Sequence, residues 1–203
     1  MTKAMAIPDG WPVRSVAEVQ ELLCAPSMPF EMEVVEIRGV PTRVWKHALP
    51  SLAALARHGR THGDATFIVY EDERISYDAW FRAVAALSAR LRAMGVEKGD
   101  RVALAMRNLP EWPVAFFAIT ALGAICVPLN AWWTGPELSY GLSNSGAKVL
   151  ICDPERLDRA APHFAELPAL EQVLVARADG AVPGAIRLED IIGGSASWST
   201  LPD

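Results

Sequence analysis

The sequence has no excess of basic residues. Its 203 residues carry 19 Lys and Arg against 24 Asp and Glu, which is a formal net charge of −5. Proteins that bind nucleic acid neutralise its phosphates with a basic surface, so we expect no nucleic-acid partner. The composition, 51% hydrophobic, also excludes collagen-like and disordered chains and indicates an ordinary folded domain.

Cysteines are few. Cys24, Cys126 and Cys152 are an odd number at wide spacings, which excludes a disulfide framework. Cys126 and Cys152 lie in apolar runs, where a free cysteine behaves as a small hydrophobic residue. We therefore expect three reduced cysteines in a cytoplasmic protein. Residues 1–10 hold one Lys and no apolar run, so we expect no signal peptide.

A long unbroken hydrophobic run is also missing. Residues 112–129 are nearly all apolar, and a membrane-spanning helix needs about 20 such residues. Pro113, Gly123 and Pro128 interrupt this run, however. We expect a buried helix followed by a buried strand here, and no membrane span.

The first part of the chain has weak periodicity. Residues 15–23 favour a short helix, and residues 31–37 and 42–45 favour two short strands around Gly39. A helix at 49–57 and a hairpin with strands at 66–70 and 74–77 follow. The predicted organisation is a short α+β N-terminal extension over 1–50, an α/β scaffold over 51–192, and a flexible Gly/Ser-rich linker over 193–203.

The remaining chain alternates helical and strand patterns. The clearest helix has apolar residues at spacings of four, three, four and three from Trp80 to Met94, with Ser76 as its N-cap and Gly95 as its stop. The expected strands are 101–106, 125–129, 148–152 and 172–176, and the expected helices are 108–122, 136–142 and 155–167. This alternation implies right-handed βαβ units and a parallel sheet, so the predicted fold class is α/β.

The helix from residue 108 carries a capping signal. Asn108 and Glu111 have the spacing of a capping box, with Asn108 as the cap. The helix that follows is apolar on most sides, so we expect it to be covered on both faces.

Two motifs suggest chemistry but favour a plainer interpretation. His58 and His62 stand four apart, as two metal ligands on a helix do. Gly59 between them indicates that the helix has ended, so we interpret both as surface-loop residues. Ser145 and Lys148 match an S-x-x-K pattern, but a glycine turn into a strand would point the two side chains apart.

Trp132 and Trp133 come just after the second expected strand. Ligands of open α/β sheets bind outside the carboxyl ends of the strands, so these indoles could line a substrate pocket or cover a partner surface. Equally, they could seal the sheet against a neighbouring element. The residues alone reveal no nucleophile, base, metal site or phosphate-binding glycine loop.

Ordered motifs from residue 75 to 153 resemble the adenylate-forming (AMP-binding) superfamily, which includes acyl-CoA synthetases. Residues 75–80 (ISYDAW) resemble its T-Y-x-E-L motif, and residues 95–102 resemble G-V-x-x-G-D-x-V. Residues 108–111 resemble N-x-x-E, residues 121–130 match A-x-x-G-A-x-x-x-P-L-N, and 137–138 and 145–149 continue the order. Residues 38–45 are most similar to bacterial fatty-acyl-CoA synthetases.

The resemblance implies a two-step ligase reaction in a longer parent enzyme. A carboxylate attacks the α-phosphate of ATP to give an acyl-adenylate and pyrophosphate, and the CoA thiol then displaces AMP. The parent would use ATP, Mg and CoA. The family's P-K-G phosphate loop, its later T-E motif, its ribose-binding Asp and its C-terminal Lys do not occur in this sequence. We therefore expect an inactive N-terminal fragment that binds none of these cofactors itself, and we assign no catalytic, cofactor-binding or metal-ligating residue.

Two rival interpretations stay open. The chain could be a non-catalytic binding or assembly module that keeps the scaffold and pairs with another chain, or an independent nucleotide-binding α/β domain. A partial domain should expose apolar surface, which favours a homodimer or other self-association. The acid substrate of the parent, whether fatty, aromatic or short-chain, stays undetermined.

Overall fold

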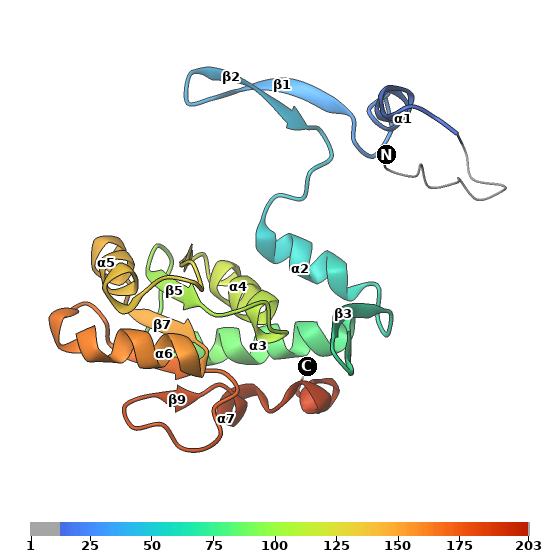
Figure 1. Ribbon diagram of the computed structural model, residues 1–203. Coiled ribbons are helices and arrows are strands. Elements are labelled where there is room, and N and C mark those ends of the chain that lie inside the picture. Colours follow the sequence, from blue (N-terminus) through green and yellow to red (C-terminus); the bar gives the residue numbers. More distant parts are fainter. Residues whose placement is uncertain (1–12, 203) are drawn as a thin grey trace, which may run out of the picture. The chain divides into compact units, whose positions relative to one another are not determined.

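The computed structural model describes residues 13–202, and the chain divides into two units, Met1–Pro50 and Ser51–Asp203. The first unit contains helix α1 (Val16–Leu23) and the strands β1 (Met32–Ile37) and β2 (Val40–Trp45) (Figure 1). The second unit contains all other elements.

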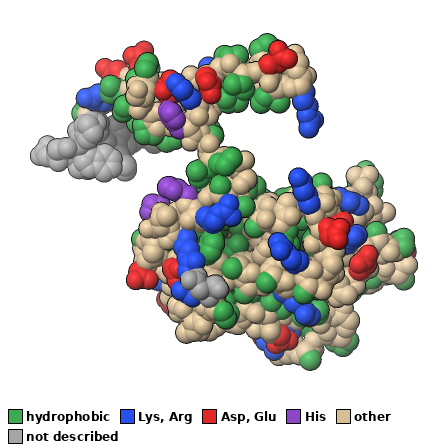
Figure 2. Space-filling view, turned by 180° about the vertical axis from the view of Figure 1, so that it is seen from behind, with side chains coloured by type: hydrophobic (Ala, Val, Ile, Leu, Met, Phe, Trp, Pro, Cys, Tyr) green, Lys and Arg blue, Asp and Glu red, His purple; other side chains and the backbone are tan. Residues whose placement is uncertain are grey.

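The first unit follows its local sequence signals. Ser15 and Glu18 form a capping box that starts α1. β1 and β2 pair antiparallel through a two-residue turn, in which Arg38 and Gly39 have φ of 51° and 80°. Positive φ at both central residues is the geometry that matches the twist of a hairpin, and this explains the glycine. Figure 2 shows hydrophobic side chains on the surface of this unit.

A parallel five-stranded sheet forms the centre of the second unit, as the α/β prediction required. Its strand order is β6-β5-β7-β8-β9, and every neighbouring pair is parallel. The strands are β5 (Arg101–Ala105), β6 (Ile125–Pro128), β7 (Val149–Cys152), β8 (Gln172–Val175) and β9 (Ile186–Arg187).

Helices cover both faces of this sheet, which explains why its strands are mostly apolar, with the polar residues Arg101, Gln172 and Arg187 at strand ends. Alternate strand residues point to opposite faces, so Leu104 and Ile151 join one buried cluster while Leu150 and Cys152 join the other. The first cluster includes α2 (Leu52–Arg60), α3 (Tyr77–Ala93), α4 (Glu111–Ala121) and α7 (Glu189–Ile192). The second includes α5 (Gly135–Ser145) and α6 (Pro154–Ala160).

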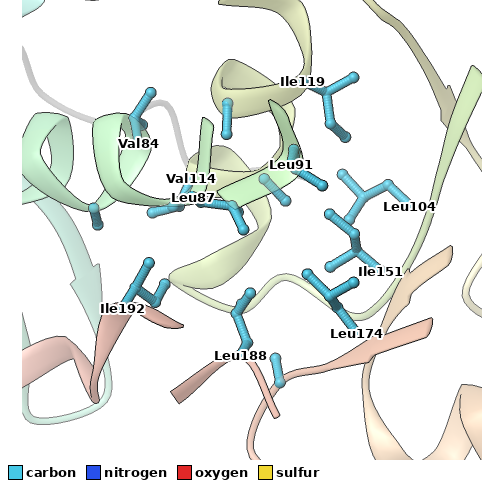
Figure 3. Packing of buried hydrophobic residues seen from close by; sticks show 14 of the residues in the cluster. Val84, Leu87, Leu91, Leu104, Val114, Ile119, Ile151, Leu174, Leu188 and Ile192 are labelled. Carbon is cyan, nitrogen blue, oxygen red and sulfur yellow. The ribbon is translucent and has the colours of Figure 1, made fainter. Parts of the chain in front are cut away.

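The first cluster is the larger core. Figure 3 shows side chains of α3 and α4 pointing toward those of the central strands and of the α7 segment. Leu87, Leu104 and Ile192 are fully buried in it. Ser76 caps α3 by accepting a hydrogen bond from the Ala79 amide, as its sequence predicts. A hairpin of β3 (Thr66–Tyr70) and β4 (Glu73–Ser76) precedes this helix.

The apolar run from 112 to 129 contains helix α4 and strand β6, as expected. Among the helices of residues 13–202, none combines the length and the apolar character that crossing a bilayer requires.

The structure corrects several local predictions. Asn108 does not cap α4, because Pro110 occupies the cap position and makes no side-chain cap bond. The helix expected at 155–167 is α6 followed by a 3₁₀ helix, η1 (Ala161–Glu166). Strand β9 and helix α7 were not predicted, because they are too short to show a periodic pattern.

The flexible linker expected over 193–203 is wrong for most of its length. Ser195–Thr200 form a 3₁₀ helix, η2, and Trp198 is fully buried in the first cluster. The Trp198 indole donates a hydrogen bond to the carbonyl of Gly193. An indole with no exposed surface anchors this segment, and the Gly/Ser composition did not reveal that anchor.

The surface-loop interpretation of His58 is also wrong, because α2 continues through Gly59 to Arg60 and includes His58. His62 lies beyond the helix end, with its ring centroid 6.1 Å from that of His58. Gly59 faces the Trp80 and Tyr77 rings, where an added Cβ would lie 3.4 Å from the Trp80 ring. Across residues 13–202, the structure contains no group of three or more His, Cys, Asp or Glu side chains arranged to hold a metal ion.

Candidate functional site at the carboxyl edge of the sheet

The topology of the sheet marks one position for a ligand. β5 lies between β6 and β7 in the sheet. The chain therefore passes from β5 to the neighbouring strand on one side, β6, and then crosses over to form the neighbouring strand on the other side, β7. The loops after β5 and β7 therefore diverge at the carboxyl ends of neighbouring strands. In open α/β sheets, ligands bind in the crevice at such a switch point.

A pocket of about 560 Å³ lies at this switch point. Residues from both diverging loops line it, and Tyr70 of the β3–β4 hairpin completes the lining. The lining residues are Tyr70, Arg107, Asn108, Leu109, Asp153, Pro154, Glu155 and Arg156. We refer to this cavity as the switch-point pocket.

Asp153 holds the two loops together. It is 5% exposed and caps α6, because its Oδ1 accepts a hydrogen bond from the Arg156 amide at 3.0 Å. Its Oδ2 accepts a second bond from the Arg107 amide at 2.9 Å, across the switch point. The shape of the pocket therefore depends on one buried carboxylate.

Arg156 is the buried cation of this pocket and is 1% exposed. Its Nη1 donates to Asp153 and to Glu155, and its Nε donates to the carbonyl of Ala131 at 2.6 Å. The guanidinium thus connects the loop after β6 to the loop after β7. Its Nη2 has no hydrogen-bond partner within residues 13–202.

Trp132 and Trp133, the two predicted pocket residues, have different environments. Trp132 is 68% exposed, and the Arg107 guanidinium lies over its ring, 4.0 Å from the centroid. Trp133 is half-buried and packs against the second cluster. Of the two tryptophans, therefore, Trp132 is the one that contacts a residue of the switch-point pocket. That residue, Arg107, has no carboxylate partner for its side chain among the described residues.

A second charged cluster lies at the same edge, around Arg177 after β8. Its Nη1 and Nη2 donate to the two carboxylate oxygens of Glu73 at 2.8 and 3.0 Å. Its Nε donates to both oxygens of Glu111 at 3.0 Å. Burial raises the pKa of Glu111, whereas the hydrogen bonds from Arg177 lower the pKa of Glu73.

The other candidate nucleophiles are occupied or inert. Lys148 Nζ pairs with Asp100 at 3.0 Å, and the Ser145 hydroxyl donates to the Leu142 carbonyl, so they do not form a Ser–Lys pair. Cys126 and Cys152 are free thiols. Burial raises the pKa of Cys126 to about 11 and also raises that of Cys152, so neither is a reactive thiolate near neutral pH.

Sequence reasoning missed the charged residues of this edge. Arg107, Asp153 and Arg177 each come within two residues of the end of a strand. Because parallel strands end at one edge of a sheet, that position was the available signal. The same position, just after an expected strand, pointed to Trp132 and Trp133 but was not applied to the charged residues that follow the other strands.

The AMP-binding enzyme family matches residues 55–191 of the chain. The 3-[(3aS,4S,7aS)-7a-methyl-1,5-dioxo-octahydro-1H-inden-4-yl]propanoyl:CoA ligase of Mycobacterium tuberculosis is 42% identical over 60% of this chain and 25% of its own length. Feruloyl-CoA synthase of Amycolatopsis is 40% identical over 52% of this chain and 21% of its own length. The chain therefore spans about a quarter or less of these curated relatives.

Solved structures agree. The anthranilate CoA ligase AuaEII, crystallised with anthranoyl-AMP, superposes on 70% of this chain with a TM-score of 0.67 at 27% identity, and 28% of that protein is covered. The N-terminal domain of FACL13 from Mycobacterium tuberculosis covers 66% of this chain with a TM-score of 0.60 at 26% identity, and 38% of that domain is covered. The parallel sheet, the ordered motifs and these matches together establish that the chain belongs to the AMP-binding enzyme family and corresponds to an N-terminal portion of its acyl-CoA synthetases.

Proposed function

We propose that these residues form the N-terminal part of an ATP-dependent acyl-CoA synthetase, which joins a carboxylic acid to CoA through an acyl-adenylate. The family match over residues 55–191 carries the proposal. The matched relatives quoted above are CoA ligases, and they act on chemically different acids. These relatives therefore support a carboxylic acid as the substrate of the longer enzyme, but they do not distinguish a fatty, an aromatic or a short-chain acid.

This chain contributes the scaffold of the domain and one region where a ligand can bind, the switch-point pocket. The sheet presents the switch-point pocket, and the Arg107 guanidinium over Trp132 forms one wall of it. Trp133, the next residue in the chain, packs against the second cluster. Arg107 and the free Nη2 of Arg156 are donors for an anionic group of a ligand.

The parent enzyme would use ATP, Mg and CoA, and the residues of the switch-point pocket suit some of the groups of these molecules but not others. The pocket can take an anionic group, but its buried carboxylate, Asp153, is already bonded to Arg156 and to the Arg107 amide. The other carboxylate of the pocket, Glu155, accepts from Arg156 and Arg159, so a metal would have to compete with arginine for either carboxylate. The sequence also has no P-K-G loop for a triphosphate. We infer that the 203 residues alone do not adenylate an acid.

The decisive experiment compares this chain with the longest polypeptide that its reading frame encodes. Each is purified and assayed for ATP–pyrophosphate exchange with fatty, aromatic and short-chain acids, and for thioester formation with CoA. We expect exchange and thioester only from the longer protein. Exchange by the 203-residue chain would contradict its inactivity, and a longer protein without any activity would favour the assembly-module alternative.

Two further properties belong to this proposal. A cytoplasmic location is supported by three free cysteines, two of them with raised thiol pKa values. Self-association is supported by exposed large hydrophobic side chains such as Ile125 and Leu55. Sedimentation of the purified chain tests the second property, and a single monomeric species would contradict it.

A further inference from the structure

Arg177 is held at the carboxyl edge of the sheet by an unusual number of contacts. Its guanidinium binds both oxygens of Glu73 from the β3–β4 hairpin and both oxygens of Glu111 from the start of α4. Its backbone amide donates to Glu189 of α7. One residue thus connects three segments that are far apart in the sequence.

The backbone conformation of Arg177 also indicates that its neighbours hold this residue in place. Its φ is 58°, in the left-handed region that a side chain with a Cβ rarely adopts. Such a conformation costs of the order of 1 kcal/mol or more and persists where the surroundings over-determine it. Here the Glu189 carboxylate accepts from the amide on one side, and two carboxylates hold the guanidinium on the other.

The same cluster continues to the switch-point pocket and to η2. The Arg177 guanidinium lies over the ring of Tyr70, 5.0 Å from its centroid, and Tyr70 lines that pocket. The hydroxyl of Ser195 donates to Glu73, and Ser195 starts the 3₁₀ helix that contains buried Trp198. Glu73 therefore joins the hairpin that forms one pocket wall to the last described helix.

We propose that Arg177 is a positioning residue, and that with Glu73, Glu111 and Glu189 it locks both the Tyr70 wall of the switch-point pocket and the 195–200 segment to the carboxyl edge of the sheet. The contacts described above support this positioning role of Arg177. The importance of that role for a ligase reaction depends on the proposed function.

The charges explain why Arg177 is needed. Glu73 and Glu111 come from two elements and bind one guanidinium. Glu189 accepts from the Arg177 backbone amide and has Arg187 3.8 Å away, and Arg74 is a cation of the hairpin itself. Without Arg177, two carboxylates at the start of α4 and on β4 would face each other unpaired. Like charges repel, and Glu111 is 4% exposed, so the hairpin would move away.

The test uses two NMR signals of the 203-residue chain, the Glu73 side-chain carboxyl and the Trp198 indole N–H, titrated together with pH. Trp198 is one of seven tryptophans and is assigned with Trp198→Phe. In the wild type we expect both signals to titrate with one midpoint, below that of an ordinary Glu, because Glu73 must be ionised to hold Arg177 and Ser195. A merely structural role for Arg177 would leave the Trp198 indole insensitive to Glu73.

Three variants sharpen the result. Arg177→Met keeps the side-chain length and the Cβ at φ 58°, and we expect it to raise the Glu73 midpoint by about one pH unit or more and to uncouple the indole. Glu73→Gln should remove the indole titration. Arg74→Met is the matched control, because within residues 13–202 Arg74 donates only to the backbone carbonyls of Glu71 and Glu73, and it should change neither signal.

The outcomes separate the two proposals. An unchanged Glu73 midpoint in Arg177→Met, or an indole that never follows Glu73, would overturn the positioning role even if the longer protein proves to be a ligase. If Arg177→Met does not fold, Glu73→Gln and the wild-type titration still decide the question. Coupled titration in a protein without ligase activity would support the lock and remove only its link to catalysis.

Discussion

The two units of the chain differ in how they hold their secondary structure. No described side chain of residues 13–50 is buried, although the segment contains a capped helix and a regular hairpin. Val34, Val40 and Trp45 of its hairpin are 67%, 60% and 56% exposed. In residues 51–202, by contrast, two buried clusters enclose the sheet from both faces.

The difference shows what local signals can and cannot do. A capping box and a two-residue turn are enough to define a helix start and a hairpin register. They supply little free energy of folding, because an isolated hairpin is marginal in water and most helix stability comes from packing. Cooperative unfolding should therefore report the second unit.

Replacing one tryptophan by alanine in each unit should change the free energy of unfolding by very different amounts, and the larger of the two changes is the largest effect that we expect. Trp80→Ala should lower the free energy of unfolding by about 3–5 kcal/mol, because a large side chain that is 2% exposed would leave a cavity in the first cluster. Trp45→Ala, at a 56% exposed position, should change it by less than about 1 kcal/mol. Urea denaturation followed by circular dichroism measures both, and equal losses would remove the contrast.

A buried arginine and its more exposed neighbour give the next comparison, within the second unit. Arg156→Met should cost about 2 kcal/mol. That is less than the loss of a fully buried pair, because Asp153 keeps its bonds from the Arg107 and Arg156 amides. Arg159→Met is the comparison. Arg159 also donates to the Trp133 carbonyl at 3.0 Å, but its side chain is 31% exposed and that of its partner Glu155 is 56% exposed. Chemical denaturation should rank Arg156 well above Arg159, and the reverse order would contradict the bridging role of Arg156.

Helix caps test the same contrast with identical chemistry. Ser76→Ala removes the bond to the Ala79 amide and should cost about 1 kcal/mol in the cooperative unfolding of the second unit. Ser15→Ala removes the capping box of α1 and should speed amide exchange in 16–23 without moving the cooperative transition. If Ser15→Ala shifts that transition as much as Ser76→Ala does, the two units unfold together.

The smallest effect is a difference in titration. Hydrogen bonds from Ser15 lower the pKa of exposed Glu18, so the α1 cap is strongest above the ordinary carboxyl pKa and weakens as pH falls through the lowered value. Burial raises the pKa of Glu111, so as pH falls the folded state takes up this proton before the unfolded chain does and gains stability in that window. Carboxyl ¹³C titration should place the Glu18 midpoint below that of Glu111, and the opposite order would contradict both assignments.

Much of the fold was predictable because its signals are local. The spacing from Trp80 to Met94 defined α3, Ser76 defined its start, and Gly39 located the turn between β1 and β2. The predicted α/β class is confirmed, and its signal was local because the strands between 101 and 175 are short, mostly apolar runs, with the polar residues Arg101 and Gln172 at strand starts. The short pair β9 and α7 escaped prediction because two- and four-residue elements carry no period.

The candidate site was predictable only in part. The pattern N-x-x-E indicated a cap at Asn108, but Glu111 instead binds Arg177, 66 positions away. Ser195 looked like part of a linker and binds Glu73, 122 positions away. The position of a charged residue in the sequence does not reveal which distant charged residue will pair with it in the fold.

The sequence alone determined the fold class, the family and the absence of a P-K-G loop among these residues, because periodicity and motifs depend on neighbouring positions. Only the tertiary structure decided that Arg107 lies over Trp132, that Asp153 joins two loops, and that Arg177 gathers carboxylates from three elements. The physical reason is that these contacts arise where parallel strands end at one edge, and chain topology brings that edge together from residues far apart in the sequence.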